Sequence, residues 1–274
     1  MTAAPSPSSP PPGTNRAAQL LAESVEKLMD SETFKAALSF RKKLYHYSFN
    51  NVWLIYCQCP TVSYVAGYRR WQELGRQVKK GEKAIAILAP LIKKTEEGEK
   101  EVFGFRAASV FDLAQTEGRV LPAFPKPELL TAEGDNYHQI IEQLKAFALA
   151  RGFKVIMHDV YGANGLFHLK SKTIYINHSL SASQKLKTFV HELAHALMHT
   201  EGTASKRHVY ELEAESCAFL VCDSLGLDTS RYTFPYLAGW ASDPREVLPA
   251  AERACRTADC ILEVLRLEEF LLTA

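Results

Sequence analysis

A ten-residue segment in the second half of the chain, residues 187–196, contains the pattern H-E-x-x-H and constrains the fold more than any other part of the sequence. On a helix, His191 and His195 stand one turn apart, so both imidazoles leave the same face and can bind one metal ion. Glu192 projects beside them toward a water on that ion. The segment therefore predicts a helix that carries a zinc-hydrolase arrangement.

The flanks of this pattern predict a helix with one buried face. Its apolar residues fall on one side, namely Phe189, Val190, Leu193, Ala194 and Leu197. Ser183 is the expected N-cap, and no Pro or Gly interrupts residues 183–200. The alternative is a core helix whose histidines stand four apart by coincidence. Two histidines and a glutamate would then need buried partners that an apolar core does not offer.

A catalytic zinc ion takes three protein ligands and keeps a fourth position for water, so a third ligand must lie downstream. His199 does not fit this role on a continuous helix, because it stands about 12 Å along the axis from His191 at about 1.5 Å per residue. A role at the end of the helix or behind the ligands suits His199 better. The glycine that breaks the helix in the longer H-E-x-x-H-x-x-G-x-x-H pattern is absent, since position 198 is Met.

A second helix is expected from Tyr210 to about residue 225, ended by Gly226. Glu211 on this helix suits the third ligand position. Glu215 lies one turn further and can accept a hydrogen bond from the outer nitrogen of a ligand histidine. Glu213 is expected to point away into solvent. The alternative for all three carboxylates is a solvated acidic face.

The E-x-x-A-E segment after H-E-x-x-H resembles the gluzincin arrangement and is similar to the metallopeptidase-like domains of IrrE and ImmA. The resemblance implies one Zn²⁺ ion held by His191, His195 and Glu211, with Glu192 as general base. A side chain that stabilises the oxyanion should also exist. Four residues could serve, and the sequence does not choose among Tyr210, His208, Tyr161 and Tyr175.

Length and composition describe a folded soluble protein of about two domains, with 274 residues, 47% hydrophobic and 23% charged. Residues 1–15 are rich in Pro and Ser and are expected to be a disordered tail. We expect no signal peptide and no membrane segment, because the longest apolar stretch, residues 84–92, is far below the roughly 20 residues that span a bilayer. Six cysteines without a C-x-x-C pair favour reduced thiols and a cytoplasmic location. No oligomeric state is predicted.

Three prolines within residues 122–127 predict a boundary between a domain at 16–125 and a domain at 126–274. Both are expected to be α+β. In the first, helices are expected at 17–30, 31–46 and 51–58 and strands at 84–91 and 102–110. In the second, a helix at 133–151 precedes a small antiparallel sheet of 153–158, 165–170 and 173–177, and a helix is expected at 249–265. Residues 166–169 could hold a peptide as an added strand.

Residues 64–83 combine basic and aromatic side chains. Six Lys or Arg against two Glu give this segment a net charge of +4, which attracts phosphate. Unpaired bases stack on aromatic faces while cations follow the backbone of single-stranded nucleic acid. The candidate DNA-binding residues are Arg69, Arg70, Trp71, Arg76, Lys79, Lys80 and Lys83. A second basic run at 41–43 is followed by Tyr45, Tyr47 and Phe49. The alternative is a solvated face over core aromatics, with Trp71 in the core.

Several segments resemble the ArdC family of plasmid antirestriction proteins. They are residues 47–51, V-A-G-Y-R-R-W-Q-E-L-G-R-Q-V-K-K-G-E-K-A-I at 65–85, V-F-D-L-A-Q-T-E-G at 110–118, and residues 236–240 with the helix that follows. The resemblance implies single-stranded DNA binding by the first domain, a zinc metallopeptidase-like second domain, and protection of incoming DNA from host restriction. The chain departs from the family after His195, where Ala196-Leu197-Met198-His199 replaces a Thr-Gly-His sequence and is closer to IrrE and ImmA.

The leading hypothesis is a single-stranded DNA-binding protein of the antirestriction type with a zinc-dependent metallopeptidase domain and a protein substrate still to be found. An alternative is a regulatory protease like IrrE that cleaves a repressor, with the first domain only bringing it to DNA. A third hypothesis keeps zinc purely structural, and the intact Glu192 argues against it.

Overall fold

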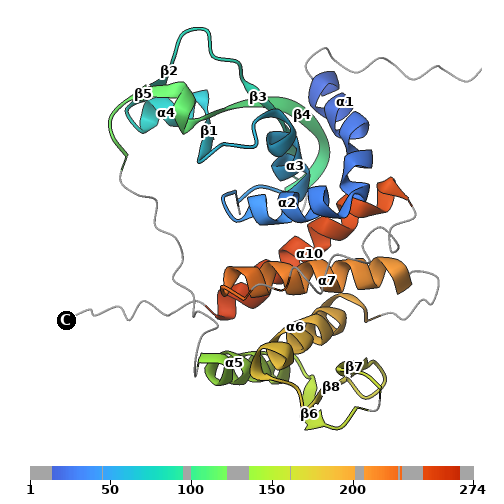
Figure 1. The fold of residues 1–274 in the computed structure, drawn as a ribbon. Helices are drawn as coiled ribbons and strands as arrows, with labels where there is room; N and C mark the ends of the chain where they lie inside the picture. The colour runs from blue at the N-terminus through green and yellow to red at the C-terminus, as the bar shows by residue number, and fades with distance from the viewer. Residues whose placement is uncertain are drawn as a thin grey trace, which may run out of the picture. The chain divides into compact units, whose positions relative to one another are not determined.

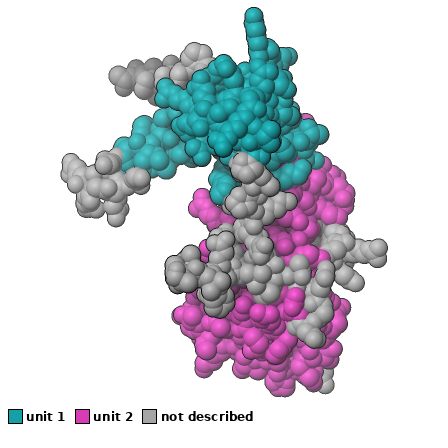
Figure 2. All heavy atoms as spheres, turned by 90° about the vertical axis from the view of Figure 1, so that its left-hand side faces the viewer, with its two compact units in different colours: residues 1–25, 43–123 teal, residues 26–42, 124–274 magenta. Residues whose placement is uncertain are grey.

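The structure is a computed structural model, and it describes residues 14–44, 46–94, 100–121, 136–160, 162–200, 207–227, 229 and 243–265. The backbone forms two compact units, residues 1–25 with 43–123 and residues 26–42 with 124–274, which Figure 2 draws in different colours. The expected tail at 1–15, apart from its last two residues, lies outside the described residues, as do the prolines at 122–127 and the segment 236–240.

The described part of the first unit holds three α-helices and an antiparallel sheet (Figure 1). The helices are α1 (Thr14–Ser24), α3 (Phe49–Gln58) and the short α4 (Tyr68–Glu73). The sheet has the order β1-β4-β3, with β1 at Val65–Gly67, β3 at Ile85–Lys94 and β4 at Lys100–Asp112. A separate antiparallel pair joins β2 (Arg76–Val78) to β5 (Thr116–Gly118). The expected third helix and both expected strands of this half are present.

The core of this unit lies between α1, α3 and the long hairpin of β3 and β4. Trp53 on α3 is buried, and its indole N–H donates to the hydroxyl of Ser24 at 2.9 Å. Asp112 at the end of β4 accepts from the backbone N–H groups of Ser63 and Tyr64 and caps the short helix η2 (Leu113–Gln115). These contacts fix the chain around β1, where the basic segment begins.

The second unit contains the helices α2 (Ser31–Arg41), α5 (Asn136–Ala150), α6 (Ala182–Met198), α7 (Arg207–Ser224) and α10 (Pro244–Val264). A single 3-10 turn, η1 (Val25–Met29), precedes α2. Helix α7 packs against α6 on one side and α10 on another, and the residues from Leu212 to Cys222 are all buried. Arg41 at the end of α2 donates to Asp259 of α10 at 3.0 Å.

A three-stranded sheet precedes α6, with β6 at Lys154–His158, β7 at Gly165–His168 and β8 at Thr173–Asn177 in the order β6-β8-β7. The expectation of an antiparallel sheet is wrong in part, because β6 pairs with β8 in parallel and only β7 pairs antiparallel. Alternation of apolar and polar residues marks a strand and its faces but does not specify the direction of its partner. Strand β8 leads directly into α6. Among the described helices, none combines the length and apolar character that a bilayer crossing requires.

Candidate metal centre

Helix α6 forms where the sequence predicts it, and its buried face holds Phe189, Val190 and Leu193 against the rest of the unit. The N-cap is Ser181, two residues before the expected Ser183, and its hydroxyl accepts from the Gln184 backbone N–H. The helix runs to Met198 without a break. His191 and His195 therefore keep the spacing of one turn that two side chains need to bind the same metal ion.

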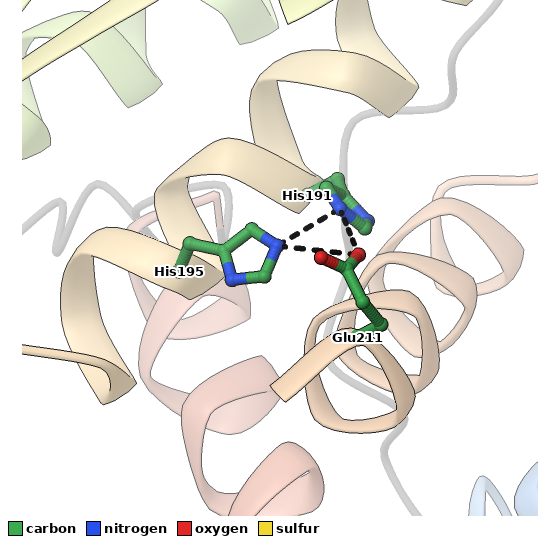
Figure 3. Close-up of side chains that lie close together, drawn as sticks. All are labelled: His191, His195 and Glu211. Atoms are coloured by element: carbon green, nitrogen blue, oxygen red, sulfur yellow. Dashed lines mark hydrogen bonds and ion pairs between the residues drawn. The ribbon is translucent and has the colours of Figure 1, made fainter. Parts of the chain in front are cut away.

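Three polar atoms converge between α6 and α7 (Figure 3). The Nε2 atoms of His191 and His195 are 3.1 Å apart, and Glu211 Oε2 lies 3.5 Å and 3.6 Å from them. Ligands at about 2.0 to 2.2 Å from a tetrahedral metal ion would be about 3.4 Å from one another. The three side chains thus match a divalent-cation site with an open fourth position.

The outer nitrogen of His191 is held by a carboxylate. Its Nδ1 lies 2.9 Å from Glu215 Oε2, and the other carboxylate oxygen of Glu215 pairs with Lys187 at 2.7 Å. If Nε2 of His191 faces a metal, Nδ1 must carry the proton and donate to Glu215. This is the position that the sequence predicts for Glu215.

The outer nitrogen of His195 is held through a longer chain of side chains. His195 Nδ1 lies 2.8 Å from Nδ1 of His199, and Nε2 of His199 lies 2.8 Å from Glu213. The guanidinium of Arg253 on α10 donates to the second oxygen of Glu213, with Nε at 2.6 Å. His199 thus lies behind His195 at the end of α6 and is not among the three converging residues, as its distance from His191 along the helix predicts.

The expectation that Glu213 is solvated is wrong. Its side chain is 1% exposed and is enclosed by α6 and α10. Helix α7 is buried around most of its circumference, so a residue opposite Glu211 meets another helix rather than water. The apolar run from Cys217 to Cys222 is the sequence signal that could have indicated this burial.

Electrostatics at the centre follow from burial and the two carboxylates. Burial lowers the pKa of His191, but the hydrogen bonds to Glu211 and Glu215 outweigh it and raise that pKa to about 9. Hydrogen bonds to His191 and His195 hold the pKa of Glu211 well below its usual range. A divalent cation would take the place of the protons that these groups share.

Glu192 lies next to His191 in the chain and is mostly buried. Burial raises the pKa of its carboxyl above the ordinary value and outweighs the neighbouring His191 and His195, which lower it. Gly165 of β7 packs so closely that an added Cβ would lie 2.9 Å from Cγ of Glu192. This glycine allows β7 to approach the helix and places the carboxylate beside the edge of the sheet.

An open cleft of about 440 Å³ exposes the three converging residues together with Glu192. The edge strand β7 forms one wall, and Leu166 on this strand and Leu169 just after it are partly exposed. Of the four oxyanion candidates, Tyr210 lines this cleft and stacks on His199 with ring centroids 4.1 Å apart. The other three candidates are not part of its described lining.

Among the other oxyanion candidates, His208 pairs with Glu246 at 3.1 Å, and Tyr161 lies outside the described residues. Tyr175 lies on the central strand β8 and is absent from the described lining of the cleft. Sequence reasoning missed Arg207, which does line the cleft. The spacing of Arg207 could have indicated this position, because it precedes Glu211 by one helical turn and so lies on the same face of the helix.

The candidate DNA-binding residues of the first unit fall into two groups. Trp71 is fully buried and donates from its indole N–H to the Phe111 carbonyl at 3.0 Å, so its ring is not available to a base. Arg76 bonds to Thr116 and Arg119, and Lys79 donates to the Ala114 carbonyl. These three contacts hold β2 against β5 and η2. Arg69, Arg70, Lys80 and Lys83 are exposed, and Lys79 is exposed as well although its ammonium group is bonded to Ala114.

Residues 17–120 match the N-terminal domain of anti-restriction factor ArdC, and residues 148–222 match the IrrE N-terminal-like domain. Together these matches account for the basic segment in one unit and the H-E-x-x-H helix in the other. The chain thus combines an ArdC-type N-terminal domain with an IrrE N-terminal-like domain. The α+β class and the two-domain organisation are thereby confirmed.

The solved relatives have the same fold. The Mn(II)-bound structure of antirestriction ArdC from the R388 plasmid is 23% identical, with a TM-score of 0.51 over 81% of this chain and 89% of that one. The metal-free structure of that protein is 20% identical, with a TM-score of 0.53 over 93% and 97%. An uncharacterized protein of Bacillus anthracis is 25% identical over 268 residues, and the matched region spans 82% of this chain and 44% of that relative.

Proposed function

We propose that the second unit holds one Zn²⁺ ion on His191, His195 and Glu211 and cleaves a peptide bond. The observation that carries this proposal is the convergence of three ligand atoms within 3.6 Å of one another beside the carboxylate of Glu192. The donor set of two imidazoles and one carboxylate with an open position is that of a catalytic zinc site. Bound zinc supplies Lewis acidity, which polarises a scissile carbonyl and lowers the pKa of water.

In this mechanism the protein side chains position the peptide and move the proton. The edge strand β7 receives the peptide backbone as an added strand and presents it to the cleft. Glu192 accepts the proton of the attacking water and returns it to the leaving amine. Tyr210 or Arg207, which both line the cleft, donates to the oxyanion. Glu215 and the His199–Glu213 pair keep the ligand imidazoles in one tautomer.

Metal content tests the ligand set. The purified protein is expected to retain about one zinc ion per chain, measured by atomic emission after gel filtration. The variants His191→Ala and Glu211→Gln should lose it, whereas His138→Ala, at an exposed histidine of α5, should keep it. Full zinc occupancy in Glu211→Gln would remove Glu211 from the ligand set.

We also propose that the first unit binds single-stranded DNA in the cytoplasm. The match of residues 17–120 to the ArdC N-terminal domain and the exposed cations Arg69, Arg70, Lys80 and Lys83 support this function. Binding of an oligonucleotide should weaken steeply with salt, because phosphate contacts release counterions. Affinity that is undetectable at low salt, or that does not change with salt, would contradict the proposal.

Two biological roles fit these activities. In the first, the protein coats incoming single strands and protects DNA from restriction, as the ArdC match favours. In the second, it cleaves a repressor, which the IrrE-like match at 148–222 favours. Parallel assays of restriction protection and repressor cleavage on wild type and Glu192→Gln separate them. Protection that survives in Glu192→Gln favours the first role, and loss of the effect favours the second.

A further inference from the structure

A concave pocket of about 260 Å³ lies in the first unit, where two basic and aromatic stretches of the sequence meet. One stretch, residues 43, 44, 46 and 47, begins at the last residue of the basic run at 41–43, and the other, residues 64–67 and 70, lies at the start of the segment of net charge +4. The hydroxyl of Tyr47 donates to the Val65 carbonyl at 3.2 Å and ties the two stretches together. The fold thus brings into one place residues that are about twenty positions apart.

The pocket offers aromatic surface. Tyr47 and Tyr64 both line it and both are half-buried, so part of each side chain remains accessible. Tyr64 is braced by an edge-to-face contact with buried Trp71, with ring centroids 5.5 Å apart. A tyrosine phenol is already neutral at pH 7, and burial together with Tyr64 raises the pKa of Tyr47 further. Trp71 thus contributes to this pocket indirectly, because its contact with Tyr64 holds that ring in place.

Basic side chains also line the pocket. Lys43 and Arg70 come from the two different stretches, His46 belongs to the same stretch as Lys43, and none of the described lining residues is acidic. Arg70 pairs with Glu73 at 2.9 Å, but both side chains are about 60% exposed, and such surface pairs contribute little to stability. The guanidinium can therefore exchange this partner for a phosphate. Strand β1 lies at the edge of its sheet and supplies the backbone of the wall.

We propose that this pocket binds one nucleotide of single-stranded DNA, with the base on Tyr47 and Tyr64 and the adjoining phosphate on Lys43 and Arg70. The assignment rests on the proposed binding of single-stranded DNA and names the place where it occurs. A volume of about 260 Å³ is below the roughly 300 to 1,000 Å³ of pockets for drug-sized ligands, which suits a single base. An unpaired base can enter such a pocket, whereas a base within a duplex is stacked and paired.

Gly67 allows the pocket to be blocked without disturbing the fold. Its backbone is extended, with φ −67° and ψ 157°, and an added Cβ would meet nothing within 4 Å. The variant Gly67→Leu should therefore fold and should fill part of the pocket. Tyr64→Leu removes a stacking surface, and Lys43→Ala removes a phosphate partner. The matched controls outside the pocket are Tyr68→Leu, at a partly exposed tyrosine of α4, and Lys93→Ala, at an exposed lysine of β3 that pairs with Glu101.

The experiment measures fluorescence anisotropy of a labelled oligo(dT) on the full-length protein, with circular dichroism melting curves for every variant. Gly67→Leu and Tyr64→Leu should each weaken binding about tenfold, as expected for one stacked base. Lys43→Ala should weaken it and reduce the slope of affinity against salt, while both controls bind within about twofold of wild type. A double-stranded competitor should displace the oligonucleotide far less well than an unlabelled single strand.

The outcomes separate this assignment from the function on which it rests. If wild type binds the oligonucleotide and the folded Gly67→Leu and Tyr64→Leu variants bind equally well, the pocket assignment is wrong and single-stranded DNA binding stands. If wild type binds no oligonucleotide, both proposals fail. Displacement of the oligonucleotide by micromolar thymidine monophosphate would identify a site for free nucleotides and would overturn the assignment to a strand.

Discussion

His191 and His195 are each oriented by a carboxylate, but through chains of different length. Glu215 contacts His191 directly, whereas Glu213 reaches His195 only through His199. All proton positions along the second chain are fixed once His195 presents Nε2 to a metal. His195 then donates from Nδ1 to His199, and His199 donates from Nε2 to Glu213. A neutral His199 therefore serves as a spacer between an imidazole ligand and a buried carboxylate.

This chain of side chains gives a prediction about metal affinity. His199→Ala and Glu213→Gln should each weaken zinc binding about 10- to 100-fold, because His195 loses the partner that fixes its tautomer. Competition with a chromophoric chelator measures the change. Glu246→Gln on α10, which removes only the pairing with His208, is the matched control and should bind zinc normally. Unchanged affinity in a folded Glu213→Gln would mean that this network serves α10 rather than the metal.

The cysteines give a second prediction at this scale. Burial raises the pKa of Cys222 and of Cys255 to about 12, so both remain protonated thiols at pH 8. Cys260 is exposed. Because the thiolate is the nucleophile, iodoacetamide at pH 8 should alkylate Cys260 in the native protein and leave Cys222 and Cys255 unmodified. Peptide mass spectrometry reads each site, and all three should react in denaturant. Rapid native labelling of Cys222 would contradict the burial.

At the scale of elements, α3 protects the open edge of the sheet in the first unit. Asn51 donates to the Leu88 carbonyl and accepts from the Leu88 N–H, both at 2.8 Å. Gln58 makes the same pair of bonds to Ala86, at 2.8 and 2.9 Å. Strand β3 is an edge strand, so these two amides replace the neighbouring strand that its backbone lacks.

Loss of one of these amides should destabilise the first unit. Asn51→Leu removes a buried amide and leaves the backbone donor and acceptor of Leu88 without their partners, and we expect a loss of about 2 to 4 kcal/mol. Urea unfolding followed by tryptophan fluorescence measures it. Gln72→Leu, at an exposed position of α4, is the control and should change stability by less than about 0.5 kcal/mol. Equal stability of the two variants would show that water replaces Asn51.

The same scale shows what the sequence can predict. Periodicity and turn residues locate α6, α7 and the strands, because these depend on local spacing. The helical spacing also places Glu211 and Glu215 opposite the histidines. Pairing between distant segments is not encoded locally, so the parallel pairing of β6 with β8 was missed. The burial of Glu213 was not predicted, and that of Trp71 was left open. The reason is the same, since each depends on an element far away in the chain.

For the whole molecule, the backbone contacts divide the chain in a way that no composition signal marks. The prolines at 122–127 predict one division, and the units change at 123–124, but residues 26–42 also belong to the second unit. Helix α2 contacts α7, and its buried Arg41 bonds to Asp259 of α10. A segment near the start of the chain thus completes the unit that carries the metal centre. The helix that the sequence predicts at 31–46 carries no local signal that it packs with α7 and α10.

Each unit has a core of its own, and the metal centre and the nucleotide pocket share no residue. Removal of the metal should therefore affect the two units differently. Dialysis against a chelator should lower the melting temperature of the second unit, since an ion that binds only the folded state stabilises it in proportion to its affinity. Oligonucleotide affinity should stay within about twofold, as should the fluorescence of Trp53 and Trp71 in the first unit. Restoring zinc should recover the melting temperature in wild type but not in His191→Ala. A large fall in oligonucleotide affinity on metal removal would instead mean that the metal centre and the DNA site are energetically coupled.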